Sequence, residues 1–290
     1  MAKNNSGDKS GDNRRNQARE NARRIAEAQN KKERTAKTIL YVGIGVVVVV
    51  VAAIVGVLIF QQSKPGITPA NVVAGGVSMA KDGEVVQPKQ MPKGEESDLP
   101  SPADAGVKKD AATVTVYLDF QCPGCKAFED ANAPTLEKLA DEGSIVLEYK
   151  PVSILDRMST GNEYSTRSAN LAACVIDSQP ETIREFFPAM YAQQPEEQGN
   201  GRTDEQLLKV AEDAGVDTSK KLKSDPEQTV KSCVTDQTFK DYVKKTSSEA
   251  LDNGVEATPW VLINGKHTDK TSDPQALTLE ILKATGEIKG

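Results

Sequence analysis

The sequence predicts an α/β domain that carries a helical insertion and follows a single N-terminal transmembrane helix. Three observations support this fold class. No charged residue occurs from Thr38 to Phe60, and from about residue 108 the apolar segments follow the order strand, helix, strand, long helical region, strand, strand, helix. In addition, Cys122 and Cys125 lie where the first of these strands meets the first helix. A chain of 290 residues has room for one large folded unit or two small ones.

Residues 1–37 form a basic tail. They contain eleven Lys and Arg against five Asp and Glu, a net charge of +6, whereas residues 38–290 sum to −12. Residues 1–12 are polar and rich in Gly, Ser and Asn, a composition typical of disordered segments. Residues 13–37 either form a solvated helix with a passive role in topology or touch anionic lipid. The acidic remainder argues against nucleic-acid binding, which requires basic surfaces.

The uncharged segment 38–60 predicts a membrane anchor. Its 23 residues exceed the roughly 20 apolar residues that cross a bilayer. A buried core helix is rarely uncharged all round over such a length. A cleaved signal peptide has an apolar region of only about 7–15 residues and a small-residue cleavage site. The Lys and Arg residues just before the segment predict a single-pass protein of the cell membrane with a cytoplasmic N-terminus, and everything after Phe60 outside.

Residues 61–107 predict an extracytoplasmic linker because they are rich in proline and glycine. We expect at most a short hairpin in this segment, around Lys81-Asp82-Gly83, since Asp-Gly is a turn signal. The linker would hold the domain of residues 108–290 off the membrane.

The segments after residue 108 predict the elements of the folded domain. Runs of β-branched and aromatic residues indicate strands, and amphipathic spacing indicates helices. The predicted elements are a strand at 113–120, a helix from Cys122 to about Ala140, a strand at 144–151, a helical insertion at about 164–253, a strand at 260–266 that runs into an Asn264-Gly265 hairpin turn, and a final helix at 274–285.

The spacing Cys122-Pro123-Gly124-Cys125 at the start of a helix indicates thiol–disulfide exchange. Unpaired backbone N–H groups and the helix dipole stabilise a thiolate there, and the thiolate is the nucleophile of this reaction. Pro123 suits the first helical turn. We expect Cys122 to be the attacking and leaving sulfur and Cys125 to resolve the mixed disulfide. Their redox-active disulfide would need no further cofactor.

Two other roles for this pair are less consistent with the sequence. A structural zinc site usually has four ligands, but Cys174 and Cys233 are isolated and His267 is the only histidine. A purely structural bridge between Cys122 and Cys125 would close too short a loop to stabilise the fold. The sequence therefore predicts no metal site.

Cys174 and Cys233 each lie in an apolar, helical context. Because the predicted topology places them in an oxidising space, a disulfide is permitted. We predict that they pair and close a loop of 59 residues across the helical insertion, which by chain entropy would contribute about 4 kcal/mol. Two buried reduced thiols, or a second redox-active pair, are the alternatives.

The segment 119–125 (Asp-Phe-Gln-Cys-Pro-Gly-Cys), with Thr258-Pro259 and a strand ending at Ile263-Asn264-Gly265, resembles the DsbA-like branch of the thioredoxin superfamily. Segments 154–158 and 164–170 resemble its actinobacterial, membrane-anchored members. The resemblance covers about residues 108–290 and implies a thioredoxin fold with an inserted helical domain. It also implies that Thr258 and Pro259 contact substrate and share a cis bond, although X-Pro bonds are trans by default.

The sequence departs from this branch at two positions. Gly124 stands where strongly oxidising members carry a histidine that stabilises the thiolate, so we expect a less extreme oxidant. Val116 stands where several relatives place a buried carboxylate. The nearest acid, Asp119, would serve either as a proton relay or in local hydrogen bonding.

The resemblance implies an oxidase that gives its disulfide to reduced exported proteins. Reoxidation would come from a membrane partner, either a DsbB-like protein or a vitamin K epoxide reductase homologue, with quinone as final acceptor. Two alternatives stay open: a reductase or isomerase on the same fold, and a non-catalytic, membrane-tethered binding module. A monomer is expected because no dimerisation segment is apparent in the sequence.

Overall fold

The computed structural model describes residues 19–20, 23–24, 31, 43–51, 67–73, 75–86, 106–196 and 199–288. The chain divides into two compact units, Met1–Pro65 and Gly66–Gly290. In the first unit residues 43–51 are helical, while the rest of the predicted anchor and most of the basic tail lie outside the described residues. Among the described residues, no helix combines the length and the apolar character that a membrane span requires.

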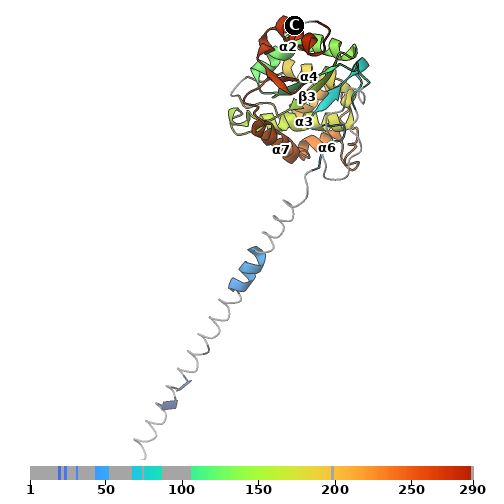
Figure 1. Cartoon of the computed structure of the whole chain (residues 1–290). Helices are drawn as coiled ribbons and strands as arrows, with labels where there is room; N and C mark the ends of the chain where they lie inside the picture. The colour runs from blue at the N-terminus through green and yellow to red at the C-terminus, as the bar shows by residue number, and fades with distance from the viewer. Residues whose placement is uncertain are drawn as a thin grey trace, which may run out of the picture. The chain divides into compact units, whose positions relative to one another are not determined.

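A mixed β-sheet forms the centre of the second unit (Figure 1). Its strands are β1 (Val77–Met79), β2 (Ala112–Leu118), β3 (Ile145–Pro151), β4 (Trp260–Ile263) and β5 (Lys266–Thr268), in the spatial order β1-β3-β2-β4-β5. Strands β2 and β3 are parallel, and the other pairs are antiparallel. The β-branched strand β2 lies in the middle, with Val114 and Val116 fully buried, as its composition predicts.

Helices cover the sheet and build the insertion between β3 and β4. They are α2 (Pro123–Asp141), α3 (Tyr164–Ser178), α4 (Ile183–Ala192), α5 (Asp204–Asp213), α6 (Val230–Thr235), α7 (Lys240–Asp252) and α8 (Pro274–Ala284), with 3-10 turns at Lys81–Gly83, Asp156–Met158, Pro180–Thr182 and Lys270–Ser272. Helix α2 packs against β3, α4 and α8, whereas α3 packs against α5, α6 and α7. Figure 1 shows α2 at one end of this unit and α6 and α7 at the other. The predicted α/β domain with a helical insertion is confirmed.

Five aromatic side chains form the part of the core that lies beneath the cysteine pair. They are Phe120, Tyr149, Phe186, Phe187 and Tyr191, all of them buried. The Phe120 and Phe187 rings meet edge to face at a centroid distance of 5.3 Å, and Tyr149 and Phe187 do so at 5.4 Å. Such pairs add to the stabilisation that burial gives. The cluster therefore fixes the chain between β2 and α2 against α4.

Residues 67–86 differ from the predicted linker 61–107, because the described part of this segment is folded onto the domain. Strand β1 pairs with β3, and its Val77 and Met79 are buried. The expected hairpin is present, since a bridge from Met79 to Val85 closes around the turn at Lys81–Gly83. A strand of three residues is too short to show a periodic pattern, and the surrounding prolines and glycines indicated a loop.

Asp177, at the C-terminal end of α3, holds two distant segments together. Its buried carboxylate accepts hydrogen bonds from the backbone N–H of Ala70 and of Lys223, both at 2.6 Å, and from Ser224 at 3.3 Å. Hydrogen bonds from backbone N–H groups to an ionised carboxylate are stronger than neutral ones. Asn71 adds a side-chain bond to the Asp177 carbonyl at 3.0 Å. The N-terminal part of the domain is thus fastened to the helical insertion.

A disulfide joins Cys174 of α3 to Cys233 of α6, with their Cα atoms 6.1 Å apart. This is the pairing predicted from the sequence. Asn170 reinforces the junction, because its side chain donates to the Cys233 carbonyl at 3.2 Å and accepts from the Phe239 N–H at 2.9 Å. Since both sulfurs are fully buried and distant in sequence from the Cys122 pair, the disulfide acts as a structural cross-link.

We expect the double substitution Cys174→Ala with Cys233→Ala to lower the free energy of unfolding by about 3–4 kcal/mol, because the cross-link closes a long loop of the unfolded chain. Chemical denaturation followed by circular dichroism measures this change. An unchanged denaturation midpoint would contradict the stabilising role. The Cys122–Cys125 pair stays intact in the variant, so its exchange activity below the transition serves as a check on folding.

Candidate active site

The structure places Cys122 at the N-cap of α2, directly after the loop that leaves β2. The Cys122 N–H donates to the Asp119 carbonyl at 2.9 Å, which closes the loop. The Cys122 sulfur accepts from the Cys125 backbone N–H at 3.4 Å, and Pro123 occupies the first helical position. Both cysteines are free thiols and are buried, with Cys122 7% exposed and Cys125 0%. The strand-to-helix setting inferred from the sequence is thus the observed one.

The pKa values of the two thiols are shifted in opposite directions. The hydrogen bond from the Cys125 thiol lowers the pKa of Cys122 to about 6, although burial opposes the shift. The Thr258 hydroxyl and the N–H groups of Cys125 and Gly124 contribute further to this lowering. Burial, together with its hydrogen bond to Cys122, raises the pKa of Cys125 well above the usual range. At neutral pH Cys122 is therefore a thiolate and Cys125 a thiol, the division of roles that exchange requires.

Thr258 and Pro259 face the cysteine pair, and the peptide bond between them is cis. The cis form is the one that the resemblance implies, and the trans default is wrong here. The Cys122 thiol donates to the Thr258 carbonyl at 3.1 Å. Among the described residues, the buried Thr258 hydroxyl has no hydrogen-bond partner in this dithiol form. It is therefore free to donate to Cys122 once that sulfur loses its proton.

Gly124 lies against the segment that contains Pro259. A Cβ atom at residue 124 would come within 3.3 Å of Pro259 Cδ, 3.5 Å of the Cys122 sulfur and 3.6 Å of the Thr258 carbonyl oxygen. A side chain at this position would thus lie directly between the helix and the cis-proline segment. The absence of one leaves thiolate stabilisation to the Cys125 thiol, the backbone N–H groups, the helix dipole and the Thr258 hydroxyl.

Asp119 anchors the loop that carries Cys122. Its buried carboxyl accepts from the Gln121 N–H at 2.9 Å, the Ser165 hydroxyl at 2.8 Å and the Leu155 N–H at 3.1 Å. Burial raises the pKa of Asp119 to about 7, and these three hydrogen bonds oppose that rise. Both carboxyl oxygens are engaged in holding the backbone. The geometry favours local hydrogen bonding over a proton relay, the two roles that the sequence left open.

Two glutamine side chains that sequence reasoning missed also position the loop. Gln194, just beyond α4, donates to the carbonyls of Phe120 at 2.9 Å and Cys122 at 3.0 Å. Buried Gln121 accepts from the hydroxyls of Ser159 at 2.6 Å and Ser165 at 3.1 Å. These partners lie between 38 and 74 positions apart in sequence, so no local pattern pointed to them.

The thioredoxin family matches residues 102–283, which is more than half of the sequence. The chain belongs to the thioredoxin family. Within this family, the pairing of Cys122 and Cys125 at the start of α2 with a cis proline opposite them is the reactive centre that the geometry defines.

Relatives within the thioredoxin family indicate which class of enzyme this chain belongs to. Disulfide bond formation protein D of Bacillus subtilis is 26% identical over 186 residues, which covers 63% of this chain and 76% of the relative. The crystal structure of oxidised DsbA from Mycobacterium tuberculosis is 29% identical, with a TM-score of 0.53 over 74% of this chain and 95% of that one. DsbG from Mycobacterium tuberculosis, in its reduced form, is 28% identical, with a TM-score of 0.55 over 76% and 92%. The chain is a DsbA-like protein thiol–disulfide oxidoreductase.

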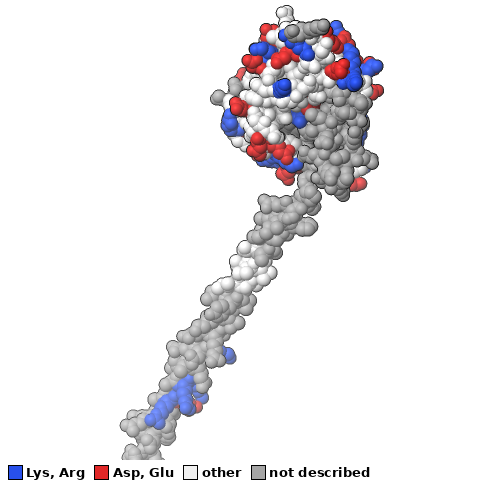
Figure 2. All heavy atoms as spheres, viewed as in Figure 1, with Lys and Arg blue, Asp and Glu red and all other residues white. Residues whose placement is uncertain are grey.

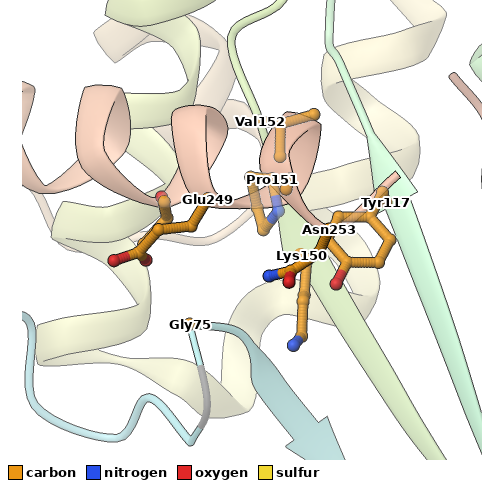
Figure 3. Close-up of a pocket in the computed structure, with 9 residues that line it drawn as sticks. Gly75, Tyr117, Lys150, Pro151, Val152, Glu249 and Asn253 are labelled. Atoms are coloured by element: carbon orange, nitrogen blue, oxygen red, sulfur yellow. The ribbon is translucent and has the colours of Figure 1, made fainter. Parts of the chain in front are cut away.

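A pocket lies apart from the cysteines, between the ends of β2 and β3 and the last turns of α7 (Figure 3). This pocket of about 330 Å³ is lined by residues that include Tyr117, Lys150 and Glu249. Its charged groups already have partners, because Lys150 pairs with Glu148 at 3.4 Å and Glu249 with Lys245 at 3.3 Å. In the described ranges, no group of three or more His, Cys, Asp or Glu side chains is arranged to hold a metal ion.

We expect Cys125→Ala to raise the pKa of Cys122 from about 6 toward the free-thiol value, because the hydrogen bond from the Cys125 thiol is the largest cause of the low value. Thr258→Val removes a smaller contribution and gives a smaller rise. The pH dependence of the alkylation rate of Cys122 measures both. Lys126→Gln is the control, since Lys126 already pairs with Asp130 at 2.9 Å. A midpoint in the Cys125→Ala variant equal to that of the unmodified protein would contradict this origin of the low pKa.

Proposed function

We propose that this oxidoreductase introduces disulfides into exported proteins by passing on its Cys122–Cys125 disulfide. The observation that carries the proposal is the opposite acidity of the two thiols. The interactions that lower the pKa of Cys122 to about 6 stabilise the reduced form of the pair, in which Cys122 is a thiolate. Stabilising the reduced form makes the disulfide a stronger oxidant, as the poise of DsbA illustrates. The same thiolate is a good leaving group when a substrate disulfide is completed.

The segment at Thr258 supports a substrate-binding role. In the dithiol form the Thr258 carbonyl accepts from the Cys122 thiol at 3.1 Å. As a thiolate or in a mixed disulfide, Cys122 has no proton to donate, so this carbonyl is available to an N–H group of an extended substrate. Thr258 directly precedes Pro259 and strand β4, which gives it a fixed position beside the reacting sulfur.

We place the catalytic domain outside the cell membrane, tethered by the uncharged segment 38–60, with the N-terminus in the cytoplasm. The basic tail of residues 1–37 supports this orientation. The disulfide between Cys174 and Cys233 supports an oxidising compartment, since such cross-links are rare in the cytosol.

Reoxidation of the dithiol would come from a membrane partner, a DsbB-like protein or a vitamin K epoxide reductase homologue, with quinone as final acceptor. A membrane tether favours electron transfer to such a partner by raising its local concentration. Acidic and basic side chains are interspersed over the described part of the face shown in Figure 2. On this face neither sign forms a separate patch, which suits contact with substrates of varied charge.

One observation favours a second candidate, a reductase or isomerase with the same site. Gly124 offers no side chain to the Cys122 thiolate, where strongly oxidising relatives use a histidine. The equilibrium reduction potential distinguishes the two directions of electron flow. The potential of a reductase such as thioredoxin is about −270 mV, whereas that of the oxidant DsbA is about −120 mV. A non-catalytic binding module is disfavoured by the low pKa of Cys122, which serves no purpose in binding alone.

We expect the purified protein, equilibrated with glutathione, to have a potential closer to about −120 mV than to about −270 mV. The oxidised protein should also restore disulfides in a reduced, unfolded test protein, and Cys122→Ser should abolish this activity. Cys125→Ser is the matched variant, since it keeps the nucleophile and should accumulate mixed disulfides. A thioredoxin-like potential would assign the reductase direction, and failure to oxidise the test protein would overturn the proposal.

A further inference from the structure

Gln194 lies just beyond the C-terminal end of α4 and reaches the loop that carries Cys122. It continues a stripe on α4 in which Phe187 and Tyr191 pack against the Phe120 ring. Residues at spacings of four and three lie on one helical face, and these three have that spacing. The Gln194 N–H donates to the Tyr191 carbonyl at 3.1 Å, so the helical turn extends to it. The stripe thus ends in a polar side chain directly beside the reactive loop.

The side-chain amide of Gln194 bridges two carbonyl groups of this loop. Its Nε2 atom donates to the Phe120 carbonyl at 2.9 Å and to the Cys122 carbonyl at 3.0 Å. An amide nitrogen carries two N–H groups, so one side chain can satisfy both acceptors. The two carbonyls lie on either side of Gln121 in the chain. One donor group therefore fixes the backbone before and after that residue.

The Cys122 carbonyl is part of the N-cap of α2. It accepts from the Cys125 N–H at 3.1 Å and the Lys126 N–H at 3.2 Å, as well as from Gln194. The sulfur of the same residue accepts from the Cys125 N–H at 3.4 Å. A rotation of Cys122 out of its N-cap conformation (φ −80°, ψ 116°) would move the carbonyl and the sulfur together. Holding the carbonyl therefore also holds the sulfur.

The other side chains of the helical insertion that hold this loop contact residues before Cys122. The Ser165 hydroxyl donates to the Gln121 side chain at 3.1 Å, and the Tyr191 hydroxyl donates to the Asp119 carbonyl at 3.4 Å. Within the described ranges, the bond from Gln194 is the hydrogen bond that joins the insertion to the nucleophilic residue itself. Loss of the other bonds would loosen the loop, whereas loss of this one would release Cys122 directly.

The backbone beside Gln194 is held in place by α3. The Gln193 carbonyl accepts from the Arg202 side chain at 2.5 Å. The Arg202 carbonyl in turn accepts from Arg167 of α3 at 2.7 Å, and Arg167 pairs with Asp204 at 2.7 Å. A side chain that starts from a fixed backbone loses less conformational freedom when it makes its hydrogen bonds. The insertion thus presents the Gln194 amide to the loop in a preorganised position.

We propose that Gln194 is a positioning residue of the exchange reaction, which holds Cys122 at the N-cap of α2 with its sulfur on the Cys125 N–H and thereby sets the oxidising strength of the disulfide. The proposal rests on the exchange activity at Cys122 and applies to either direction of electron flow. It gives the helical insertion a direct influence on the redox chemistry, through two residues that lie 72 positions apart in sequence.

Reduction of the disulfide shows why this contact affects oxidising strength. Two glutathione thiols lose two electrons and two protons and join, while the bond between Cys122 and Cys125 breaks. One proton stays on Cys125, and the other goes to solvent because Cys122 remains a thiolate. Interactions that stabilise this thiolate therefore favour reduction. Without Gln194 the sulfur is free to move away from the Cys125 N–H, and hydrogen bonds to the charged form are what lower its pKa.

Gln194→Met tests the proposal, because methionine keeps the length of the side chain and removes both donors. In the full-length protein we expect the pKa of Cys122 to rise from about 6 by roughly half a unit, the effect of about one hydrogen bond. The alkylation rate of Cys122 at pH 5 should therefore fall about 3-fold. The equilibrium constant for oxidation of glutathione should also fall about 3-fold, a shift of about 14 mV toward reducing potentials.

Gln193→Met is the matched control. It replaces the same type of residue one position earlier, and within the described part of the chain Gln193 makes its hydrogen bonds through its backbone. The pKa of Cys122 and the equilibrium constant should stay at the values of the unmodified protein. A purely structural role of Gln194 would lower the denaturation midpoint of Gln194→Met and leave both quantities unchanged, which would overturn the proposal. Equal shifts in the two variants would overturn it as well.

Failure of the proposed direction of electron flow would be visible separately. It would appear as an unmodified protein that does not oxidise reduced proteins, while the difference in the pKa of Cys122 between Gln194→Met and Gln193→Met would remain.

If Gln194→Met does not fold, nuclear magnetic resonance of the reduced, nitrogen-15-labelled full-length protein tests the same contact. The side-chain amide signal of Gln194 should shift with pH at the midpoint found for alkylation of Cys122, because its acceptor carbonyl belongs to the titrating residue. The side-chain amide of Gln193 is the internal control and should lack this midpoint. A Gln194 amide signal that does not follow the titration of Cys122 would overturn the proposal.

Discussion

The hydrogen bond from the Cys125 thiol to the Cys122 sulfur is the interaction on which the chemistry of this protein depends. It is the largest cause of the low pKa of Cys122, and it exists only because both residues occupy the first turn of α2. That placement in turn requires β2 to stop where it does and the following loop to stay fixed. A helix that began one residue later would separate the sulfur from the N–H groups that stabilise its charge.

The rest of the domain holds that loop from three directions. The Asp119 carboxyl and the Gln121 side chain tie it to the start of α3, and Gln194 ties it to the end of α4. Phe120 packs its ring against aromatic side chains of α4, one of which also contacts Tyr149 of β3. Because α3 is also cross-linked to α6 by a disulfide, the helical insertion acts as a rigid support behind the reactive cysteines.

Elements with a local sequence pattern could be predicted from the sequence, whereas features that depend on contacts between distant residues could not. Strand β2, helix α2 and the pairing of Cys174 with Cys233 followed from apolar patterns and from cysteine spacing. Strand β1 and the contacts of Gln194 did not, since a three-residue edge strand and a long-range hydrogen bond leave no periodic trace. The cis bond before Pro259 came from family resemblance alone, because physics favours trans for an isolated X-Pro bond.

Gly124 bears on how strong an oxidant the Cys122–Cys125 disulfide is. Without a histidine, the Cys122 thiolate still has a hydrogen bond from Cys125, two backbone N–H groups and the Thr258 hydroxyl. The hydroxyl belongs to the cis-proline segment, for which we propose a role in substrate binding, so stabilisation of the leaving thiolate and contact with substrate would involve the same residue. A histidine at position 124 would separate those functions, and its side chain would have to fit against Pro259, only 3.3 Å from the Cβ position. With glycine at position 124, the Thr258 hydroxyl of the cis-proline segment adds to the stabilisation that Cys125 and the start of the helix provide.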